Sequence, residues 1–133
     1  MKINLKRLDD HMHFEASNSA GHTIELAGGG KAVGPMESVL MALAGCSGID
    51  VVSILKKMKL DLKDIQVEVN GERATDQTAA VFTKIDVHYK LYGDIPAAKA
   101  ERALELTFTK YCSVSIMLQK AVEINYSYEI LEE

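Results

Sequence analysis

The N-terminal part of the chain alternates hydrophobic and polar residues with a period of two. Such alternation is typical of β-strands whose two faces meet different surroundings. Asp9-Asp10 and residues 17–21 separate the alternating segments and carry turn-forming residues. We therefore predict three antiparallel strands at the start of the chain, over residues 3–8, 11–16 and 22–26.

The segment from Met36 to Leu55 is apolar on every face in its first half, and Pro35 precedes it. Proline suits the first turn of a helix, so we predict a helix over residues 36–58. A helix that is hydrophobic all round is buried all round. Ser47, Asp50 and Ser53 interrupt the run, which favours a buried helix in a core over a membrane span.

Further period-two segments predict strands over residues 64–74, 81–94 and 123–131. Between them, apolar spacings of three and four predict a helix over residues 97–112, and a separate short helix follows from Ser113, with Ser113 or Ser115 as its cap. The predicted order is βββ-α-ββ-αα-β, which is typical of an α+β fold and not of a parallel α/β repeat. At 133 residues we expect a single domain over residues 1–133.

Composition narrows the classes of function. A net charge of −4 gives no indication of a nucleic-acid or anionic-membrane partner. The first ten residues have no apolar core typical of a signal peptide, so we expect a cytoplasmic protein. His11 and His13 share one side of a predicted strand, but no third ligand stands at a diagnostic spacing. We accordingly expect neither a metal nor a cofactor.

Two cysteines, Cys46 and Cys112, stand 66 positions apart without a CxxC motif. Both could be buried packing residues. A reactive role requires a thiolate, and an unshifted thiol with a pKa of about 8.5 is only about 3% ionised at pH 7. Burial alone would raise the pKa of Cys46 further, so a reactive Cys46 needs a cation or several hydrogen-bond donors nearby.

Three charged residues could belong to such a site. Arg7 is the only arginine before Arg73, and by parity it shares a strand face with Ile3 and Leu5. Glu37 lies in the first turn of the predicted helix, where it would also complement the helix dipole. Asp50 lies one helical turn after Cys46, on roughly the same face, and as an acid on a buried helix it should have a partner.

The two cysteine-bearing segments, "GPMESVLMALAGCSGIDVVSIL" and "KYCSVSIML", together with the element order, resemble the OsmC/Ohr family of thiol-dependent peroxidases. The first segment looks closest to a little-characterised OsmC-like branch. The resemblance implies an OsmC-like fold in an intertwined homodimer, with the long central helix packed between sheets. It also implies a cytoplasmic protein of the oxidative stress response.

The resemblance further implies that Cys46 attacks an organic hydroperoxide and that Cys112 closes a disulfide, which a small or lipoylated dithiol reopens. Arg7 and Glu37 would hold the thiolate and the peroxide. Met36, however, occupies the place of the family's acid, and Glu37 is rotated by about 100° from it. A second function therefore fits the pattern as well: a non-catalytic binding protein that holds an apolar ligand at the dimer interface.

Overall fold

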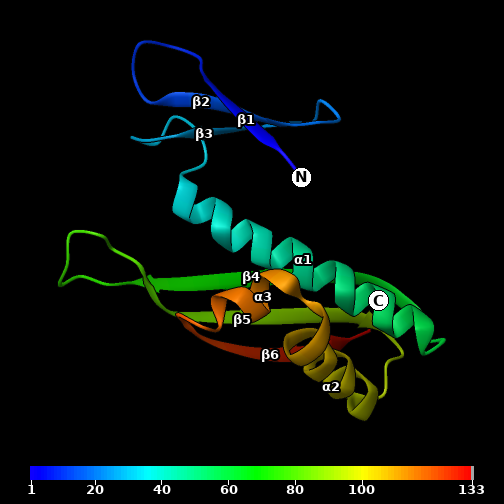
Figure 1. Ribbon diagram of the computed structural model, residues 1–133. Helices are drawn as coiled ribbons and strands as arrows, with labels where there is room; N and C mark the ends of the chain where they lie inside the picture. Colours follow the sequence, from blue (N-terminus) through cyan, green and yellow to red (C-terminus); the bar gives the residue numbers. More distant parts are fainter. Residues whose placement is uncertain (133) are drawn as a thin grey trace. The chain divides into compact units, whose positions relative to one another are not determined.

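A computed structural model describes residues 1–132 and divides the chain into two units, Met1–Val39 and Leu40–Glu133 (Figure 1). The observed element order confirms the predicted βββ-α-ββ-αα-β sequence, with one added π-helical turn, η1. The elements are β1 (Ile3–Arg7), β2 (His13–Asn18), β3 (Thr23–Ala27), α1 (Pro35–Lys57), β4 (Leu62–Arg73), β5 (Phe82–Gly93), α2 (Ala97–Leu106), η1 (Thr107–Tyr111), α3 (Ser113–Leu118) and β6 (Glu123–Leu131).

The N-terminal unit holds a three-stranded antiparallel sheet with the order β1-β2-β3. We expected the face of β1 that carries Ile3, Leu5 and Arg7 to point at a core, but every residue of β1 is exposed. A sheet buries a face only against another layer, and residues Met1–Val39 contain no second sheet and only the first turn of α1. His13 pairs with Glu25, with 2.6 Å between Nε2 and Oε1.

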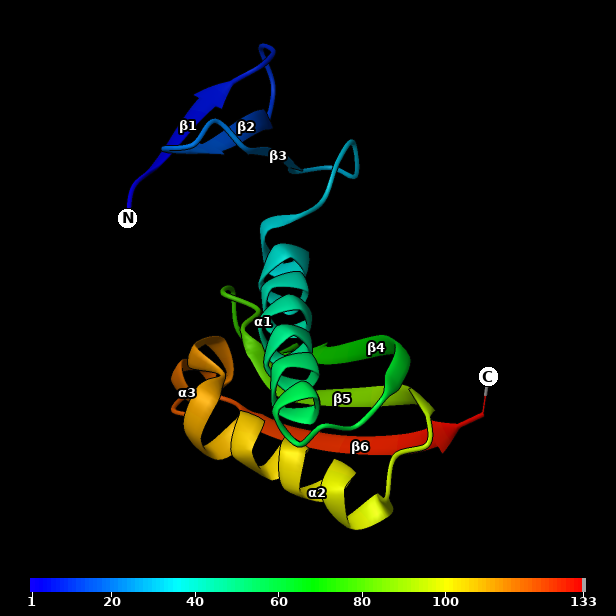
Figure 2. The same ribbon diagram turned by 90° about the vertical axis from the view of Figure 1, so that its right-hand side faces the viewer.

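The second unit is built on a sheet with the order β4-β5-β6 (Figure 2). Strands β4 and β5 form an antiparallel hairpin, whereas β6 pairs with β5 in parallel. The period-two alternation predicted along β5 is confirmed, because its apolar positions Ile85, Val87, Tyr89 and Leu91 are all buried. A parallel neighbour requires a crossover connection, and the segment α2–η1–α3 supplies it.

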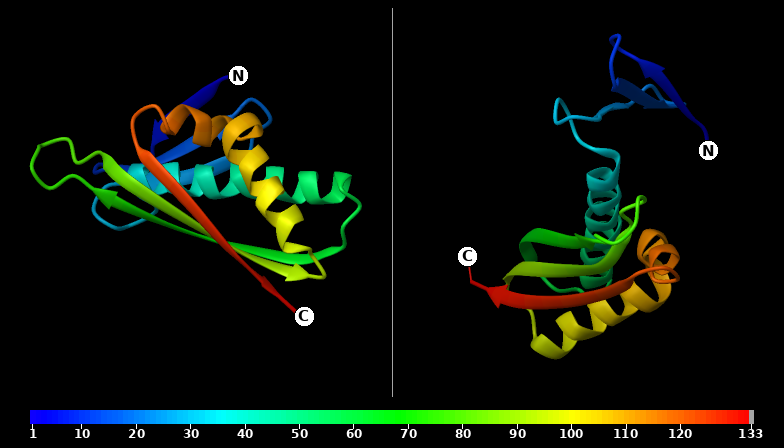
Figure 3. Two further views of the ribbon diagram at one scale, coloured as in Figure 1. Left: turned by 90° about the horizontal axis from the view of Figure 1, so that it is seen from below. Right: turned by 90° about the vertical axis from the view of Figure 1, so that its left-hand side faces the viewer.

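Helices α1 and α2 cover the same face of this sheet (Figure 3). The core between the helices and the sheet contains side chains from three elements: Leu43, Val51 and Leu55 of α1, Tyr89 and Leu91 of β5, and Ala100, Ala103 and Leu104 of α2. Gly71 on β4 leaves no room for a side chain, because a Cβ there would lie 2.7 Å from the Phe82 ring of β5 and 3.1 Å from the Leu40 side chain of α1. The site described below is therefore positioned by a well-packed sheet.

Phe108 of η1 lies between two tyrosines of the sheet. Its ring stacks on Tyr126 of β6 with 4.8 Å between centroids, and meets Tyr89 of β5 edge-on at 6.3 Å. Both geometries are favourable for aromatic pairs. This aromatic stack, Tyr89–Phe108–Tyr126, fixes the segment just before Cys112 onto the sheet.

Helix α1 has the length and composition of a membrane-spanning helix, with a mean hydropathy of 1.9 over its most apolar window. Only 28% of that window is buried within the chain. The exposed apolar side chains of α1 include Met41, Ile49 and Val52. The prediction that α1 is buried all round is therefore wrong for the single chain: Leu43 and Val51, on the side that faces the sheet, are fully buried, and the opposite side is exposed.

Candidate active site

Helix α1 positions Cys46 through the residue beside it. Ser47 is fully buried, and its Oγ accepts a 2.6 Å hydrogen bond from the hydroxyl of Tyr89 on β5. Ser47 Oγ also donates to the carbonyl of Ala44, at 3.3 Å. Because Tyr89 is itself fully buried in the sheet, this contact fixes the rotation of α1. Cys46 is consequently held half-buried at the edge of the core.

Cys112 lies in the junction between η1 and α3. We predicted a helix running from residue 97 to Cys112, but α2 ends at Leu106 and the wider π-helical turn follows. Cys112 itself is extended, with φ −77° and ψ 101°, and its amide donates to the carbonyl of Thr107. A π-helical turn changes the direction of the residues after it, and such turns are frequent at functional sites.

The cap of α3 also differs from our expectation. Neither Ser113 nor Ser115 is the capping residue: Cys112 occupies the N-cap, and its Sγ accepts the backbone N–H of Ser115 at 3.4 Å. Gln119 then ties α3 back to η1 by donating to the carbonyl of Phe108 and to Ser115 Oγ. Cys112 is fully buried.

Helix α1 and the junction between η1 and α3 bring three side chains together. Two of them lie one turn apart on α1, and the third is distant in sequence. The Sγ atoms of Cys46 and Cys112 and a carboxylate oxygen of Asp50 all lie within 4.8 Å of one another. We refer to these residues as the Cys46–Asp50–Cys112 cluster. Two thiols at this range can form a disulfide after modest side-chain movement, and the same donors can also ligate a metal ion.

The surroundings of the cluster favour neutral groups. Burial raises the pKa of Cys112 to about 12; the Ser115 N–H opposes that rise, and the neighbouring Cys46 and Asp50 add to it. Burial also raises the pKa of Asp50, whose Oδ2 is buried without a hydrogen-bond partner among the described residues. None of the groups that shift the pKa of Cys112 is a cation.

A cleft of about 250 Å³ reaches the cluster at Asp50. Its lining consists of Asp50, Ser53, Ile54, Lys57, Met58, Leu106 and Tyr111. Lys57 supplies a positive charge on this lining, and most of the remaining lining is apolar. The cleft therefore offers a route by which a small molecule or an ion reaches the edge of the cluster.

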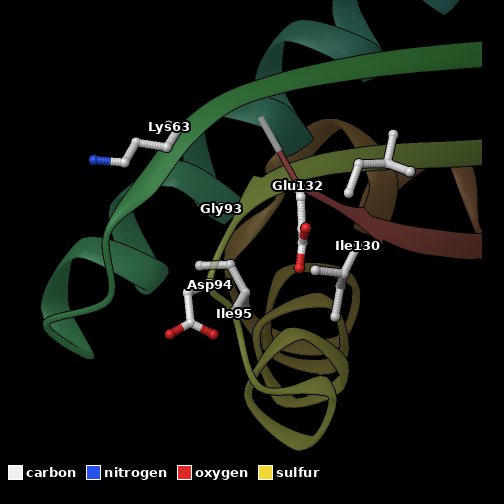
Figure 4. Close-up of a pocket in the computed structure, with 7 residues that line it drawn as sticks. Lys63, Gly93, Asp94, Ile95, Ile130 and Glu132 are labelled. Atoms are coloured by element: carbon white, nitrogen blue, oxygen red, sulfur yellow. The ribbon is translucent and has the colours of Figure 1, made fainter.

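A larger cavity, of about 580 Å³, lies elsewhere in the same unit (Figure 4). It is lined by Lys63, Gly93, Asp94, Ile95, Ile130, Leu131 and Glu132. This lining has no thiol and no imidazole, so it offers no nucleophile matched to neutral pH. The reactive groups of this unit thus lie at the Cys46–Asp50–Cys112 cluster and not at its larger cavity.

Arg7 and Glu37 belong to the N-terminal unit, where both have structural partners. Arg7 donates from Nε to the carbonyl of His11 at 2.7 Å and from a terminal nitrogen to that of Asp10 at 2.6 Å. Glu37 accepts the N–H of Gly34 at 2.9 Å, three residues before it, as an N-terminal capping contact does. Their predicted roles beside the thiolate stay predictions.

Sequence reasoning missed the Ser47–Tyr89 contact and gave Asp50 no partner. The signal for Asp50 was present, since a spacing of four residues from Cys46 predicts a shared helix face. Its proximity to Cys112 depends on the long-range packing of α1 against η1 and α3, which no local pattern encodes.

Comparison with known proteins identifies the family. A family model for OsmC-like protein matches residues 28–127. Protein YhfA of Escherichia coli K12 is 46% identical over 121 residues, covering 89% of this chain and 90% of YhfA. A crystal structure from Aquifex aeolicus VF5 is 30% identical with a TM-score of 0.90, covering 99% of this chain and 96% of that one.

A more distant solved structure is the organic hydroperoxide resistance protein OsmC of Legionella pneumophila, which is 15% identical with a TM-score of 0.74 and shares the fold over 97% of each chain. Because the family match spans well over half of the 133 residues and the E. coli relative aligns along nearly the whole chain, this protein belongs to the OsmC-like family.

Proposed function

We propose that the protein is a cysteine-dependent peroxidase that reduces organic hydroperoxides through a Cys46/Cys112 thiol–disulfide cycle. The observation that carries the proposal is the position of the two sulfur atoms, within 4.8 Å of each other although they are far apart in sequence. The fold is shared with a protein whose name assigns it to organic hydroperoxide resistance, which supports the same chemistry.

The exposure of the two cysteines supports the proposed roles. Cys46 is half-buried, whereas Cys112 is fully buried and its pKa is raised to about 12. An incoming peroxide meets the more accessible thiol first, so Cys46 is the attacking residue. Cys112 is held within reach but in its neutral form, which suits a residue that reacts in the second step.

The chemical steps balance as follows. The Cys46 thiolate attacks the outer peroxide oxygen; an S–O bond forms as the O–O bond breaks, and the alkoxide leaves and is protonated to the alcohol. Cys46 is then a sulfenic acid. Cys112 then gives up its proton to solvent and its sulfur attacks that of Cys46; hydroxide leaves as water after protonation, and a disulfide results. A small or lipoylated dithiol supplies two electrons and two protons to restore both thiols.

Arg7 is the residue that the family resemblance implies as the cation beside the Cys46 sulfur. We propose that the protein acts as a cytoplasmic homodimer, in which a second copy of the chain covers the exposed apolar side chains of α1. Met41 and Ile49, at 56% and 71% exposure, support this part of the proposal. Glu37, which lies in the same unit as Arg7, would orient the peroxide.

The test is a thiol count after a single addition of peroxide. Fully reduced protein mixed with cumene hydroperoxide should lose two hydrogens by mass spectrometry. Cys46→Ser should abolish the loss, and Cys112→Ser should instead accumulate a sulfenic acid that dimedone traps. Ser53→Ala, on the cleft lining and without redox chemistry, is the matched control and should react like the wild type.

A second candidate is a binding protein of the same fold, with the cysteines as packing residues. It is favoured by the absence of a cation among the groups acting on Cys112 and by the apolar lining that Ile54, Met58 and Leu106 give the cleft. Thiols that survive a large excess of cumene hydroperoxide, together with saturable uptake of a fluorescent fatty-acid analogue, would support this function over the peroxidase.

A further inference from the structure

The Cys46–Asp50–Cys112 cluster has the chemistry of a metal site. Among the described residues it is the one group of three or more cysteine, histidine or carboxylate side chains close enough to hold an ion. Its donors come from α1 and from the N-cap residue of α3, two elements labelled in Figure 1, and the fold brings their ligand atoms within 4.8 Å of one another.

The distances fit a tetrahedral site. With Zn–S bonds of about 2.3 Å, two thiolates bound to one zinc ion stand about 3.8 Å apart. The donor atoms lie within 4.8 Å of one another before any ion pulls them inward. Small rotations of three side chains would therefore complete three of the four positions, and the fourth stays open to water.

The donor types select the class of ion. Two sulfur donors and one carboxylate suit a borderline-soft divalent cation of the zinc type, whereas magnesium and calcium require an all-oxygen site. With both thiols deprotonated the three donors carry a charge of −3, which a divalent ion reduces to −1.

Asp50 supplies an independent argument. Its Oδ2 is buried and has no hydrogen-bond partner in the described part of the chain, and buried polar atoms without partners are rare in folded proteins. A bound cation would give this oxygen a partner. Asp50 also lines the 250 Å³ cleft, so the route from solvent ends at one of the three ligands.

We propose that the reduced protein binds one divalent cation of the zinc class through Cys46, Asp50 and Cys112. A disulfide between the two cysteines removes both sulfur donors, so ion binding and disulfide formation exclude each other. The bound ion thus protects the thiols from oxidation, and oxidation of the thiols releases the ion. No change of oxidation state of the ion is involved.

The test is a titration of reduced, chelator-treated full-length protein with Cd²⁺, whose thiolate complexes absorb in the ultraviolet. We expect the charge-transfer band to saturate at one equivalent per chain, Zn²⁺ to displace Cd²⁺, and Mg²⁺ to have no effect. Cys46→Ser and Cys112→Ser should each lose most of the band. Asp50→Asn should bind at least about tenfold more weakly.

Asp76→Asn makes the same change of charge on an exposed loop residue and should titrate like the wild type. The proposal is overturned if no thiolate band forms at stoichiometric Cd²⁺, if Asp50→Asn and Asp76→Asn bind equally well, or if the disulfide form binds as tightly as the reduced form. The titration uses no peroxide. A protein that binds Zn²⁺ but does not react with cumene hydroperoxide would therefore refute the peroxidase alone.

Discussion

Replacing Asp50 with asparagine should stabilise the folded protein at neutral pH in the absence of metal. The Asp50 carboxylate is desolvated, and its Oδ2 lacks a partner among the described residues, so its negative charge costs folding free energy. A buried polar atom left unpaired costs about 1–3 kcal/mol. Asparagine keeps a polar atom there and removes only the charge, so we expect a gain of about 1 kcal/mol, or about 4 °C in Tm.

The gain should depend on pH in a defined direction. Burial raises the pKa of Asp50 in the folded state above its ordinary value of 3.8. Below 3.8 the carboxyl is neutral in both the folded and unfolded states, and the wild type loses nothing. As the pH rises from 3.8 through the folded-state pKa, the buried carboxylate becomes charged and the free energy of unfolding of the wild type falls. The difference between Asp50→Asn and the wild type should therefore be smallest near pH 4 and complete by pH 8.

Urea unfolding followed by far-UV circular dichroism, at fixed chain concentration with chelator and reductant, measures both effects. The control variant Asp76→Asn should stay within about 0.5 kcal/mol of the wild type. Zn²⁺ at 100 times the wild-type Kd should stabilise the wild type by about 2.7 kcal/mol and a variant that binds tenfold more weakly by about 1.4 kcal/mol, so the advantage of Asp50→Asn should disappear. An Asp50→Asn variant that is no more stable than the wild type at pH 8 would refute the reasoning, because Asp50 would then have a favourable partner.

Three further outcomes are expected. Because the pKa of Cys112 is raised to about 12, the rate of disulfide closure after peroxide treatment should rise about tenfold per pH unit from pH 7 to 10. Mass spectrometry of quenched samples measures this rate, and a rate that levels off below pH 9 would contradict the prediction. Ser47→Ala leaves the buried Tyr89 hydroxyl without its partner and should cost about 1–3 kcal/mol in urea unfolding, whereas Tyr89→Phe should cost only about 1 kcal/mol; equal costs would argue against the contact. Ile49→Asp, on an exposed face of α1, should convert a homodimer to monomer on a sizing column, and an unchanged elution volume would count against dimerisation through α1.

Local patterns predicted the order of the elements correctly because each pattern reports on one element at a time. Period-two alternation located β5 and β6, and Pro35 located the start of α1. The parallel pairing of β6 with β5 and the π-helical turn at Thr107–Tyr111 depend on contacts between distant segments. Those contacts are absent from any short window of sequence.

The candidate site was predictable to a lesser extent. The spacing of 66 residues between Cys46 and Cys112 carries no geometric information, and the pair was linked only through the family resemblance. The sequence placed Asp50 on the same helix face as Cys46, but it gave no indication that Asp50 also lies near Cys112. That Cys112 is fully buried, and that its pKa is raised as a result, required the packed structure, because desolvation depends on every surrounding element.

The aromatic stack has a consequence for how the distance between the two sulfurs is set. Tyr89 contacts both sides of the site: its hydroxyl bonds Ser47, beside the first cysteine, and its ring meets Phe108, four residues before the second. One side chain of a rigid strand thus serves as the common reference point for both cysteines. Because α1 and the crossover connection both contact this side chain, the sheet holds them in place together. The distance between the two sulfur atoms therefore depends on the sheet and not on either helix alone.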